Sequence, residues 1–332
     1  MAGHVPVSEA VDLERILAAE SRLKGEVRRT PLLSAPALDA MAGRRLLVKA
    51  ECLQHTGSFK FRGGWAALSA LPEEVRGVVA ASSGNHAQGI ALAAARHDKA
   101  AVIVMPSDAP GAKISGTRAL GAELVLYDRA REDRNALCHE IASARGFALI
   151  PPFDHPEVIA GQASVGLELA EQARGLAAEV LVCCGGGGLS AGIALALEAR
   201  APQMRLRTVE PEGFEDMARA LATGTITPNA ARTGLCDAIL TPEPGGLTLP
   251  ILRRLAGRGL VVTDVEVLRA MALAFAHLKL VIEPGGAVAL AAALFHPEEI
   301  AGDTVVVIAS GGNVDADVFI RALEQGACDA DR

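Results

Sequence analysis

Short aliphatic runs alternate with Ala-rich stretches of helical periodicity along most of this sequence. The runs stand at 46–50, 78–81, 101–105, 124–127, 180–184, 205–209, 260–262 and 304–309. The helical stretches between most of them include 87–96, 162–174, 191–200, 265–278 and 286–294. Unbroken aliphatic runs are typical of strands buried on both faces, and their alternation with helices predicts an α/β fold with doubly wound parallel sheets.

Several of these runs end in Gly- or Ser-rich turns, with the sequences SSGNH, CGGGG and SGGN. Ligands of doubly wound folds bind outside the carboxyl ends of the strands, so we expect the functional residues in these turns. With 332 residues, the chain is long enough for two domains. Pro- and Gly-rich segments at 151–152 and 242–246 are plausible joints between domains.

Composition and charge argue against several classes of function. Half of the residues are hydrophobic and 3% are aromatic, so Ala, Leu, Val and Ile must fill the core. The formal charge is −7, and aromatic residues are not interleaved with Arg or Lys, which argues against a nucleic-acid partner. No run of about 18 apolar residues is present, which argues against a membrane-spanning helix.

The N-terminal segment has no positively charged head followed by an apolar run, so we expect no secretory signal and a cytoplasmic location. The cysteines show no zinc-type spacing, and we expect them to be reduced thiols. They are Cys52, Cys138, Cys183, Cys184, Cys236 and Cys328. The adjacent pair at 183 and 184 fits the end of a buried strand better than a redox pair.

A lysine flanked by two phenylalanines, Lys60, stands near an expected helix start in the segment TGSFKFRGG (56–64). Burial among apolar neighbours and the positive end of a helix both lower the pKa of an amine, and a neutral amine is what an imine-forming lysine needs. A surface lysine whose stem lies along apolar neighbours is an equally good interpretation of this segment alone.

Four consecutive glycines, Gly185–Gly188, follow one expected strand and precede an expected helix. Their backbone N–H groups and the helix N-terminus can cradle a phosphate. The turn lacks the lysine of a nucleotide-binding P-loop, and the run of adjacent glycines fits a single phosphate better than a dinucleotide. A tight strand–helix turn without a ligand rarely needs four glycines.

Two further turns carry hydrogen-bonding side chains. The segment SSGNH (82–86) has hydroxyl and N–H groups at a helix start that would bind a carboxylate; ordinary capping explains one of these residues but not the cluster. The segment SGGN (310–313) places a hydroxyl at a strand end. By itself SGGN indicates no more than a turn.

Taken together and in this order, these motifs resemble the serine/threonine dehydratase and serine racemase family of fold type II pyridoxal 5′-phosphate (PLP) enzymes. The resemblance extends from about Glu14 to Val318 and includes VIAGQ (158–162) and IEPGGA (282–287). It implies a tryptophan synthase β-like fold, with two doubly wound parallel-sheet domains and the active site between them. The expected division is 1–76 plus 153–332 for the large cofactor-binding domain and 77–152 for the small domain.

The resemblance also implies residue roles. Lys60 would bind the cofactor covalently and act as a catalytic base, and Ser83 would be the second catalytic residue, the acid–base group on the opposite face in the racemase. The residues expected around the cofactor are Phe59, Lys60, Asn85, Gly185, Gly186, Gly187, Gly188, Leu189, Glu283 and Ser310. The residues expected around the substrate are Ser82, Ser83, Gly84, His86, Arg134 and Thr241.

An acidic segment at 210–216 has two interpretations. Four acids in seven residues are usually a solvated surface. In the resembled family, the positions of Glu210, the Phe214 carbonyl and Asp216 bind a divalent cation, and hard oxygen ligands suit Mg²⁺ or Ca²⁺. Arg134 also has two interpretations: it would bind a distal carboxylate of the substrate through two hydrogen bonds, or it would lie on a charged surface.

The reaction implied is β-elimination from a β-hydroxy-α-amino acid such as L-serine, L-threonine or 3-hydroxyaspartate, giving a 2-oxo acid and ammonia. A serine racemase, a β-replacement enzyme such as cysteine synthase and a catalytically silent PLP-binding protein are the alternatives. A homodimer is expected from the resemblance alone. Departures from the family at Trp65, at 160–164 (AGQAS) and at 236–238 (CDA) affect the expected substrate pocket and leave cofactor binding untouched.

Overall fold

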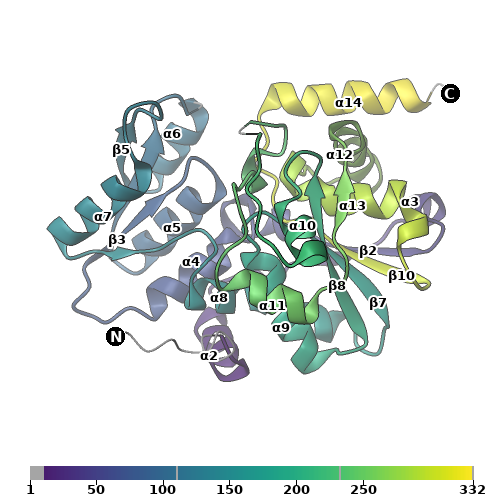
Figure 1. Cartoon of the computed structure of the whole chain (residues 1–332), viewed down its shortest axis with the longest axis horizontal. Coiled ribbons are helices and arrows are strands. Elements are labelled where there is room, and N and C mark those ends of the chain that lie inside the picture. Colours follow the sequence, from purple (N-terminus) through teal and green to yellow (C-terminus); the bar gives the residue numbers. More distant parts are fainter. Residues whose placement is uncertain (1–10, 110, 232, 331–332) are drawn as a thin grey trace.

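The computed structural model describes residues 11–109, 111–231 and 233–330, which form two parallel sheets with helices around them (Figure 1). The larger sheet has the order β1-β2-β10-β7-β8-β9, and only β1 runs antiparallel to its neighbour. Its strands are β1 (Leu32–Leu33), β2 (Arg45–Lys49), β7 (Ala178–Cys183), β8 (Met204–Pro211), β9 (Leu260–Val262) and β10 (Thr304–Ile308).

The smaller sheet is wholly parallel, with the order β5-β4-β3-β6. Its strands are β3 (Gly77–Ala81), β4 (Ala100–Pro106), β5 (Glu123–Tyr127) and β6 (Ala148–Leu149). The predicted α/β fold with doubly wound parallel sheets is therefore confirmed. All eight predicted strands are present, with ends that differ by up to two residues, whereas the two-residue strands β1 and β6 were not predicted.

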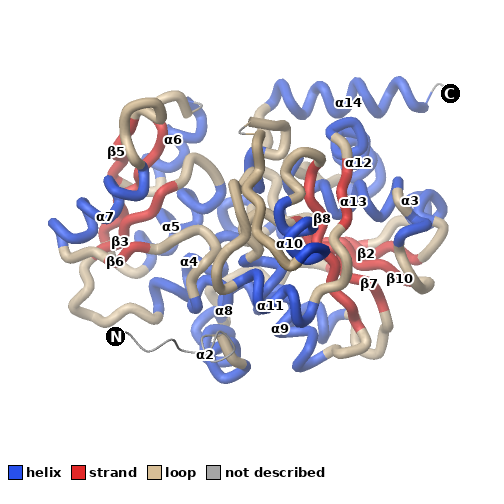
Figure 2. Tube along the Cα trace, viewed as in Figure 1, coloured by secondary structure: helices blue, strands red, loops and turns tan. Residues whose placement is uncertain are grey.

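Helices cover both sheets (Figure 2). Their bounds are α2 (Leu13–Leu23), α3 (Pro36–Ala42), α4 (Lys60–Ser69), α5 (Asn85–Arg96), α6 (Gly111–Ala119), α7 (Arg134–Arg145), α8 (Pro156–Gln172), α9 (Gly188–Arg200), α10 (Asp216–Thr223), α11 (Thr248–Leu255), α12 (Asp264–Leu278), α13 (Pro284–Phe295) and α14 (Ala316–Ala330). Short 3₁₀ turns lie at Glu51–Leu53, His55–Gly57, Asp237–Ile239 and Pro297–Glu299. None of the described helices combines the length and the apolar character needed to cross a membrane.

Helix α4 packs into the cores of both sheets. Its residue Ala66 belongs to the core of the larger sheet, whereas Phe61 and Trp65 belong to the core on one face of the smaller sheet. Along β3, Val78 and Val79 point to opposite faces, as the two-residue period of a strand requires. The helix that carries Lys60 therefore joins the two sheets, although the expected division assigned it to the larger unit; the division itself stays a prediction.

Candidate active site

Lys60 is the first residue of α4, and its side chain is partly exposed while its amine is surrounded by protein. The amine donates a hydrogen bond to the Pro152 carbonyl at 2.7 Å and lies 5.2 Å from the centre of the Phe59 ring. Burial lowers the pKa of this amine to about 8, and the nearby Cys183 thiol and Glu283 carboxyl offset only part of that effect. About half of the amine is therefore uncharged at pH 8, as a nucleophilic or basic lysine requires.

The tetraglycine turn, Gly185–Gly188, connects β7 to α9. Gly187 has a φ of 92°, the left-handed conformation that favours glycine. A Cβ on Gly186 would lie 2.3 Å from the Phe153 ring, and one on Gly188 would lie 2.9 Å from Phe153 Cβ. The backbone N–H groups of the turn donate to no acceptor among the described residues. The turn thus has donors free for an anion at a helix N-terminus, which fits the phosphate of PLP.

The SSGNH segment lies at the end of β3 and leads into α5, as the sequence predicts. Ser82 Oγ accepts a hydrogen bond from the Gly84 N–H at 3.1 Å, which shapes the turn. His86 is buried, and its ring nitrogen lies 2.9 Å from the Ile150 carbonyl oxygen. Burial, followed by the charge of Lys60, lowers the pKa of His86 to about 3, so the imidazole stays neutral at physiological pH.

Asn85 and Glu283 join this turn to the larger sheet. The Asn85 amide donates to Glu283 Oε1 at 2.5 Å, and its oxygen accepts from the Asn313 amide at 2.7 Å. Burial raises the pKa of Glu283 to about 8, although the hydrogen bond from Asn85 opposes this shift. The carboxyl of Glu283 also interacts electrostatically with Lys60, so the segments that carry Lys60, Asn85 and Glu283 meet in one place.

Ser310 follows β10 and is buried beside the same cluster. The Cys183 thiol donates to Ser310 Oγ at 3.2 Å, and burial raises the pKa of Cys183 to about 11. The two are held together because β7 and β10 are neighbours in the sheet. Both Cys183 and Cys184 are buried free thiols, in agreement with the predicted strand end.

The acidic segment is only partly a solvated surface, because Glu210, Phe214 and Asp216 are buried. The two carboxylate oxygens of Glu210 accept hydrogen bonds from the N–H groups of Met217 and Ala218 at 2.8 and 2.7 Å. Burial raises the pKa of Glu210 well above its ordinary value and that of Asp216 to about 6. Asp216 Oδ2 and the hydroxyl of Thr241 are buried, and neither has a hydrogen-bond partner among the described residues.

Among the described residues, no hydrogen bond or ion pair joins the Arg134 side chain to the other expected substrate residues. Arg134 lies exposed at the start of α7, where its side chain donates to Asn135 Oδ1 at 3.4 Å. Ser83 is partly exposed at the end of the smaller sheet, and Leu189 is buried in the first turn of α9. The roles of these residues stay predictions.

Sequence reasoning missed residues that surround the tetraglycine turn. Phe153 packs against Gly186 and Gly188, and the Thr248 hydroxyl donates to the Gly186 carbonyl at 2.6 Å. Asp154, next to Phe153, accepts hydrogen bonds from two backbone N–H groups just before α11. These residues stand far from the glycines in the sequence and form no recognisable motif, so a local pattern does not reveal them.

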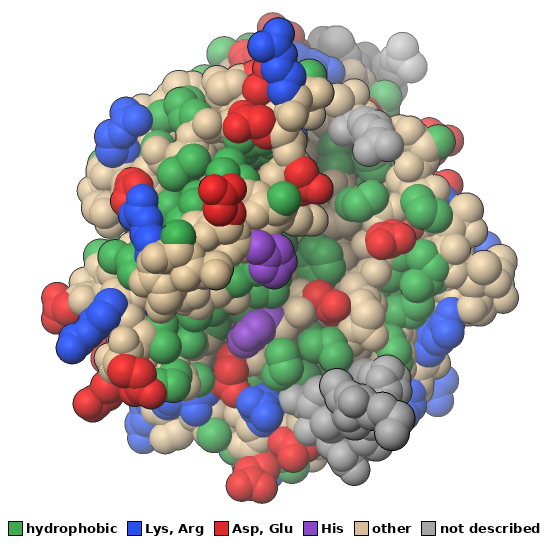
Figure 3. Space-filling view, turned by 60° about the vertical axis from the view of Figure 1, so that its left-hand side comes forward, with side chains coloured by type: hydrophobic (Ala, Val, Ile, Leu, Met, Phe, Trp, Pro, Cys, Tyr) green, Lys and Arg blue, Asp and Glu red, His purple; other side chains and the backbone are tan. Residues whose placement is uncertain are grey.

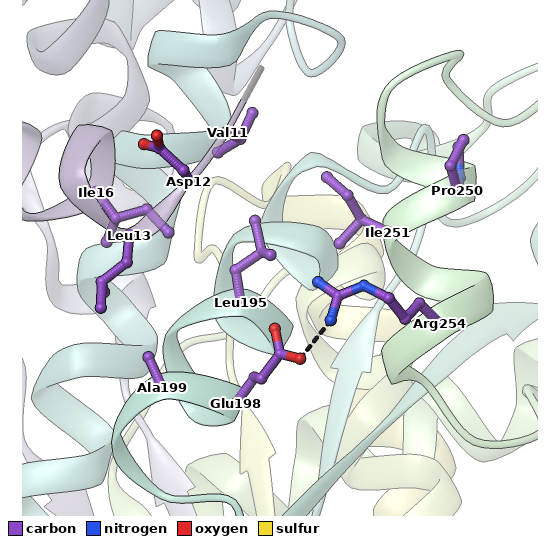
Figure 4. A pocket seen from close by; sticks show the side chains of 10 residues that line it. All are labelled: Val11, Asp12, Leu13, Ile16, Leu195, Glu198, Ala199, Pro250, Ile251 and Arg254. Carbon is purple, nitrogen blue, oxygen red and sulfur yellow. Dashed lines mark hydrogen bonds and ion pairs between the residues drawn. The ribbon is translucent and has the colours of Figure 1, made fainter. Parts of the chain in front are cut away.

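Of two hollows in the described part of the structure, one adjoins the residues gathered around Lys60, Asn85 and Glu283. This hollow, of about 410 Å³, is lined by residues that include Lys113, Asp237, Pro284 and Asn313. The other, of about 280 Å³, lies between α2, α9 and α11 around the ion pair of Arg254 with Glu198, and none of the expected site residues lines it (Figure 4). The face drawn in Figure 3 is hollowed near its middle, with histidine side chains along the edge of the hollow.

Comparison with known proteins gives consistent results. The profile of the family described as "Pyridoxal-phosphate dependent enzyme" matches residues 23–311. An L-threo-3-hydroxyaspartate ammonia-lyase from Pseudomonas sp is 43% identical, over 93% of this chain and 97% of that protein. Another from Saccharomyces cerevisiae is 41% identical, over 90% of this chain and 92% of that protein. The structure of maize serine racemase superimposes with a TM-score of 0.88 at 35% identity, covering 97% of this chain and 100% of that one.

Proposed function

This chain belongs to the family of pyridoxal-phosphate dependent enzymes, and from that premise we propose that it is an ammonia-lyase of β-hydroxy-α-amino acids that prefers L-threo-3-hydroxyaspartate. The observation that carries the proposal is the Lys60 amine, whose pKa is lowered to about 8 beside a turn with unused N–H donors. Two relatives named for 3-hydroxyaspartate, each aligned over at least 90% of this chain, support the substrate.

We assign the cofactor contacts residue by residue. The N–H groups of Gly185–Gly188 and Leu189 would hold the phosphate, Phe59 would lie against the ring, and Asn85 with Glu283 would face the ring hydroxyl. The Ser310 hydroxyl would meet the ring nitrogen; because it is a neutral group rather than a carboxylate, it favours elimination over transamination. When bound, PLP supplies an electron sink conjugated to the α-carbon of the substrate.

The protein's own groups would then act on the substrate. N–H and hydroxyl groups of Ser82, Ser83 and Gly84, with neutral His86, would bind the α-carboxylate at the start of α5. The Lys60 amine would take the proton from the α-carbon as a general base. The bond to the β-hydroxyl would then break, and that group would leave as water, so that in net terms it takes up the proton removed from the α-carbon. The enamine that is released reacts with water, so the net products are a 2-oxo acid and ammonia.

Substrate choice depends on a group for the second carboxylate. Arg134 is our candidate, because a guanidinium binds a carboxylate through two parallel hydrogen bonds. Thr241 is a second pocket candidate, and its buried hydroxyl has no hydrogen-bond partner in the part of the chain that the structure describes. We further propose that Mg²⁺ or Ca²⁺ binds Glu210, the Phe214 carbonyl and Asp216. Two buried carboxyls with raised pKa values support this site, as does Asp216 Oδ2, which has no hydrogen-bond partner within residues 11–109, 111–231 and 233–330; a dication would stabilise the charged forms of both carboxyls.

Racemisation is the second candidate function. Its support is that Ser83 is partly exposed, together with the likeness to maize serine racemase; the Ser83 hydroxyl would return the proton on the face opposite Lys60. We also propose a cytoplasmic homodimer with two domains divided at residues 77 and 152. The exposed apolar side chains of Phe275, Val281 and Ile320 support self-association, and the free buried thiols support a reducing compartment.

The test is a panel assay of the PLP-loaded protein. Ammonia and 2-oxo acid are measured with L-threo-3-hydroxyaspartate, L-serine and L-threonine, with Mg²⁺ or with EDTA, and the remaining substrate is analysed for chirality. We expect the highest kcat/KM with 3-hydroxyaspartate and a lower rate in EDTA. We expect Lys60→Ala to lose turnover and the visible absorbance of the lysine-bound cofactor, whereas the exposed Lys24→Ala should keep both.

Three results would contradict the proposal. If Lys60→Ala released ammonia at the wild-type rate, Lys60 could not be the catalytic base. Interconversion of the serine enantiomers faster than release of keto acid would make racemisation the main function. Retention of PLP without turnover of any of the three substrates would favour a silent binding protein.

A further inference from the structure

The Gly186 carbonyl oxygen, in the middle of the tetraglycine turn, is held by two donors. The buried Thr248 hydroxyl donates to it at 2.6 Å, and the Gly245 N–H donates at 3.2 Å. Both donors come from residues 245–248, at the start of α11. The turn between β7 and α9 is therefore attached to a third segment of the chain, more than fifty residues further along the sequence.

This attachment fixes the direction of an N–H group. The Gly186 carbonyl and the Gly187 N–H belong to one planar trans peptide, in which C=O and N–H point in opposite directions. Because the oxygen is held by Thr248 and Gly245, the Gly187 N–H must point away from them. A Cβ on Gly187 would lie 2.8 Å from Thr248 Oγ1, so the segments approach too closely for a side chain there.

Asp154 fixes residues 245–248, the segment whose Thr248 and Gly245 hold the tetraglycine turn. Its two carboxylate oxygens accept hydrogen bonds from the N–H groups of Gly246 at 2.9 Å and Leu247 at 2.8 Å. Phe153, its neighbour, packs against Gly186 and Gly188. Pro152, one residue earlier, accepts the hydrogen bond from the Lys60 amine. Residues 152–154 thus contact both the lysine and the turn.

We propose that Asp154 and Thr248 are positioning residues for the phosphate of the cofactor, and we name the pair the Asp154–Thr248 clamp. Thr248 orients the peptide between Gly186 and Gly187, and Asp154 fixes the backbone from which Thr248 acts. Neither residue touches the phosphate; each acts through the turn. The inference rests on the proposed function, because it takes the turn as the phosphate site, and it extends that function to residues outside the binding motifs.

The competing explanation is that Asp154 only caps α11. A cap satisfies the free N–H groups at a helix start, and its loss lowers the stability of the fold. It would not change how the protein distinguishes a phosphorylated ligand from the same ligand without phosphate. That difference separates a positioning role from a structural one.

The experiment compares the binding of PLP and of pyridoxal, which carries the same aldehyde but no phosphate. Dissociation constants are measured from the visible absorbance of the lysine-bound form in the wild type, Thr248→Val, Thr248→Ser and Asp154→Asn. Asp133→Ala is the matched control, because Asp133 also caps a helix through two backbone N–H groups, at 2.8 and 3.1 Å, at the start of α7. Melting temperatures report the effect of each variant on the fold.

We expect Thr248→Val and Asp154→Asn to weaken PLP binding about three- to tenfold, the effect of losing one hydrogen bond, and to leave pyridoxal binding within about twofold of the wild type. Thr248→Ser keeps the hydroxyl and should bind PLP like the wild type. Asp133→Ala should keep the wild-type ratio of the two constants, even if its melting temperature falls.

Unchanged PLP binding in both Thr248→Val and Asp154→Asn would overturn the clamp, and so would an equal loss of PLP and pyridoxal binding. Thr248→Ser and Asp154→Asn are conservative enough to keep the test open if Thr248→Val does not fold. Failure of the wild type itself to bind PLP would instead contradict the proposed function, so the two failures are distinguishable.

Discussion

The pKa of the Lys60 amine follows from what surrounds it. Within the described chain its one hydrogen bond goes to a neutral carbonyl, that of Pro152, and the Phe59 ring lies beside it. The acidic groups with which it interacts, Cys183 and Glu283, are themselves buried, and their pKa values are raised to about 11 and about 8. Their neutral forms give the ammonium little compensation for lost hydration, so burial decides the direction of the shift.

This residue gives a prediction about chemical reactivity. In protein freed of cofactor, acetylation of Lys60 by acetic anhydride should rise with pH and reach half of its maximum near pH 8, because only the neutral amine reacts. A lysine side chain in a model peptide, with the ordinary pKa of 10.5, serves as the reference. Mass spectrometry of the labelled peptide gives the extent of reaction. A midpoint for Lys60 equal to that of the model peptide would contradict the expected neutral amine.

Among the elements, α4 is anchored by a buried group of ions just beyond Lys60. Arg62 forms two hydrogen bonds of 2.8 Å with Glu51 and one of 2.7 Å with Glu168, while Lys49 pairs with Glu168 at 2.5 Å. The two positive side chains thus balance the two negative ones. The Arg62 guanidinium also donates hydrogen bonds to the Ser164 hydroxyl and to the Arg28 carbonyl. Helix α4, the 3₁₀ turn after β2 and helix α8 are thereby tied together.

Breaking this group should cost much more stability than breaking an exposed ion pair. We expect Arg62→Met to lower the free energy of unfolding by about 3–5 kcal/mol, because it leaves buried carboxylates without their partner. Arg129→Met removes the exposed pair with Asp108 (N–O distance 2.9 Å) and should cost no more than about 1 kcal/mol. Urea unfolding of both variants measures the difference; equal losses would show that the buried group does not anchor the helix.

In the whole molecule, the site exists because turns that follow strands of the two sheets meet. The larger sheet contributes the tetraglycine turn and Ser310, and the smaller sheet contributes the SSGNH segment. Asn85 bonds with Glu283 and Asn313 across the junction. Farther out, Lys113 of α6 pairs with Asp237 at 2.7 Å beside the 410 Å³ hollow, again joining the two sides.

This outer ion pair should affect catalysis more than stability. Asp237→Asn should lower kcat/KM by up to about fivefold, because closure of the two sides around substrate loses an attraction, and should change Tm by about 2 °C or less. Glu123→Gln, which weakens an ion pair with Arg145 inside the smaller unit, is the control and should leave kcat/KM unchanged. If both variants lower kcat/KM equally, the junction has no special role.

Local patterns were enough to predict eight of the ten described strands, several of the helices and the motifs, because these depend on neighbouring residues: aliphatic runs make strands, and glycine and serine clusters make turns at their ends. Through the resemblance, those motifs also predicted which residues would surround Lys60; Glu283 does lie near the amine, whereas Arg134 lies exposed at the start of α7. Local patterns did not predict that α4 packs into two cores, that Asn85 bonds to Glu283 or that Asp154 and Thr248 hold the tetraglycine turn. These contacts join residues far apart in the chain, and the packing of whole elements, which leaves no local pattern, brings them together.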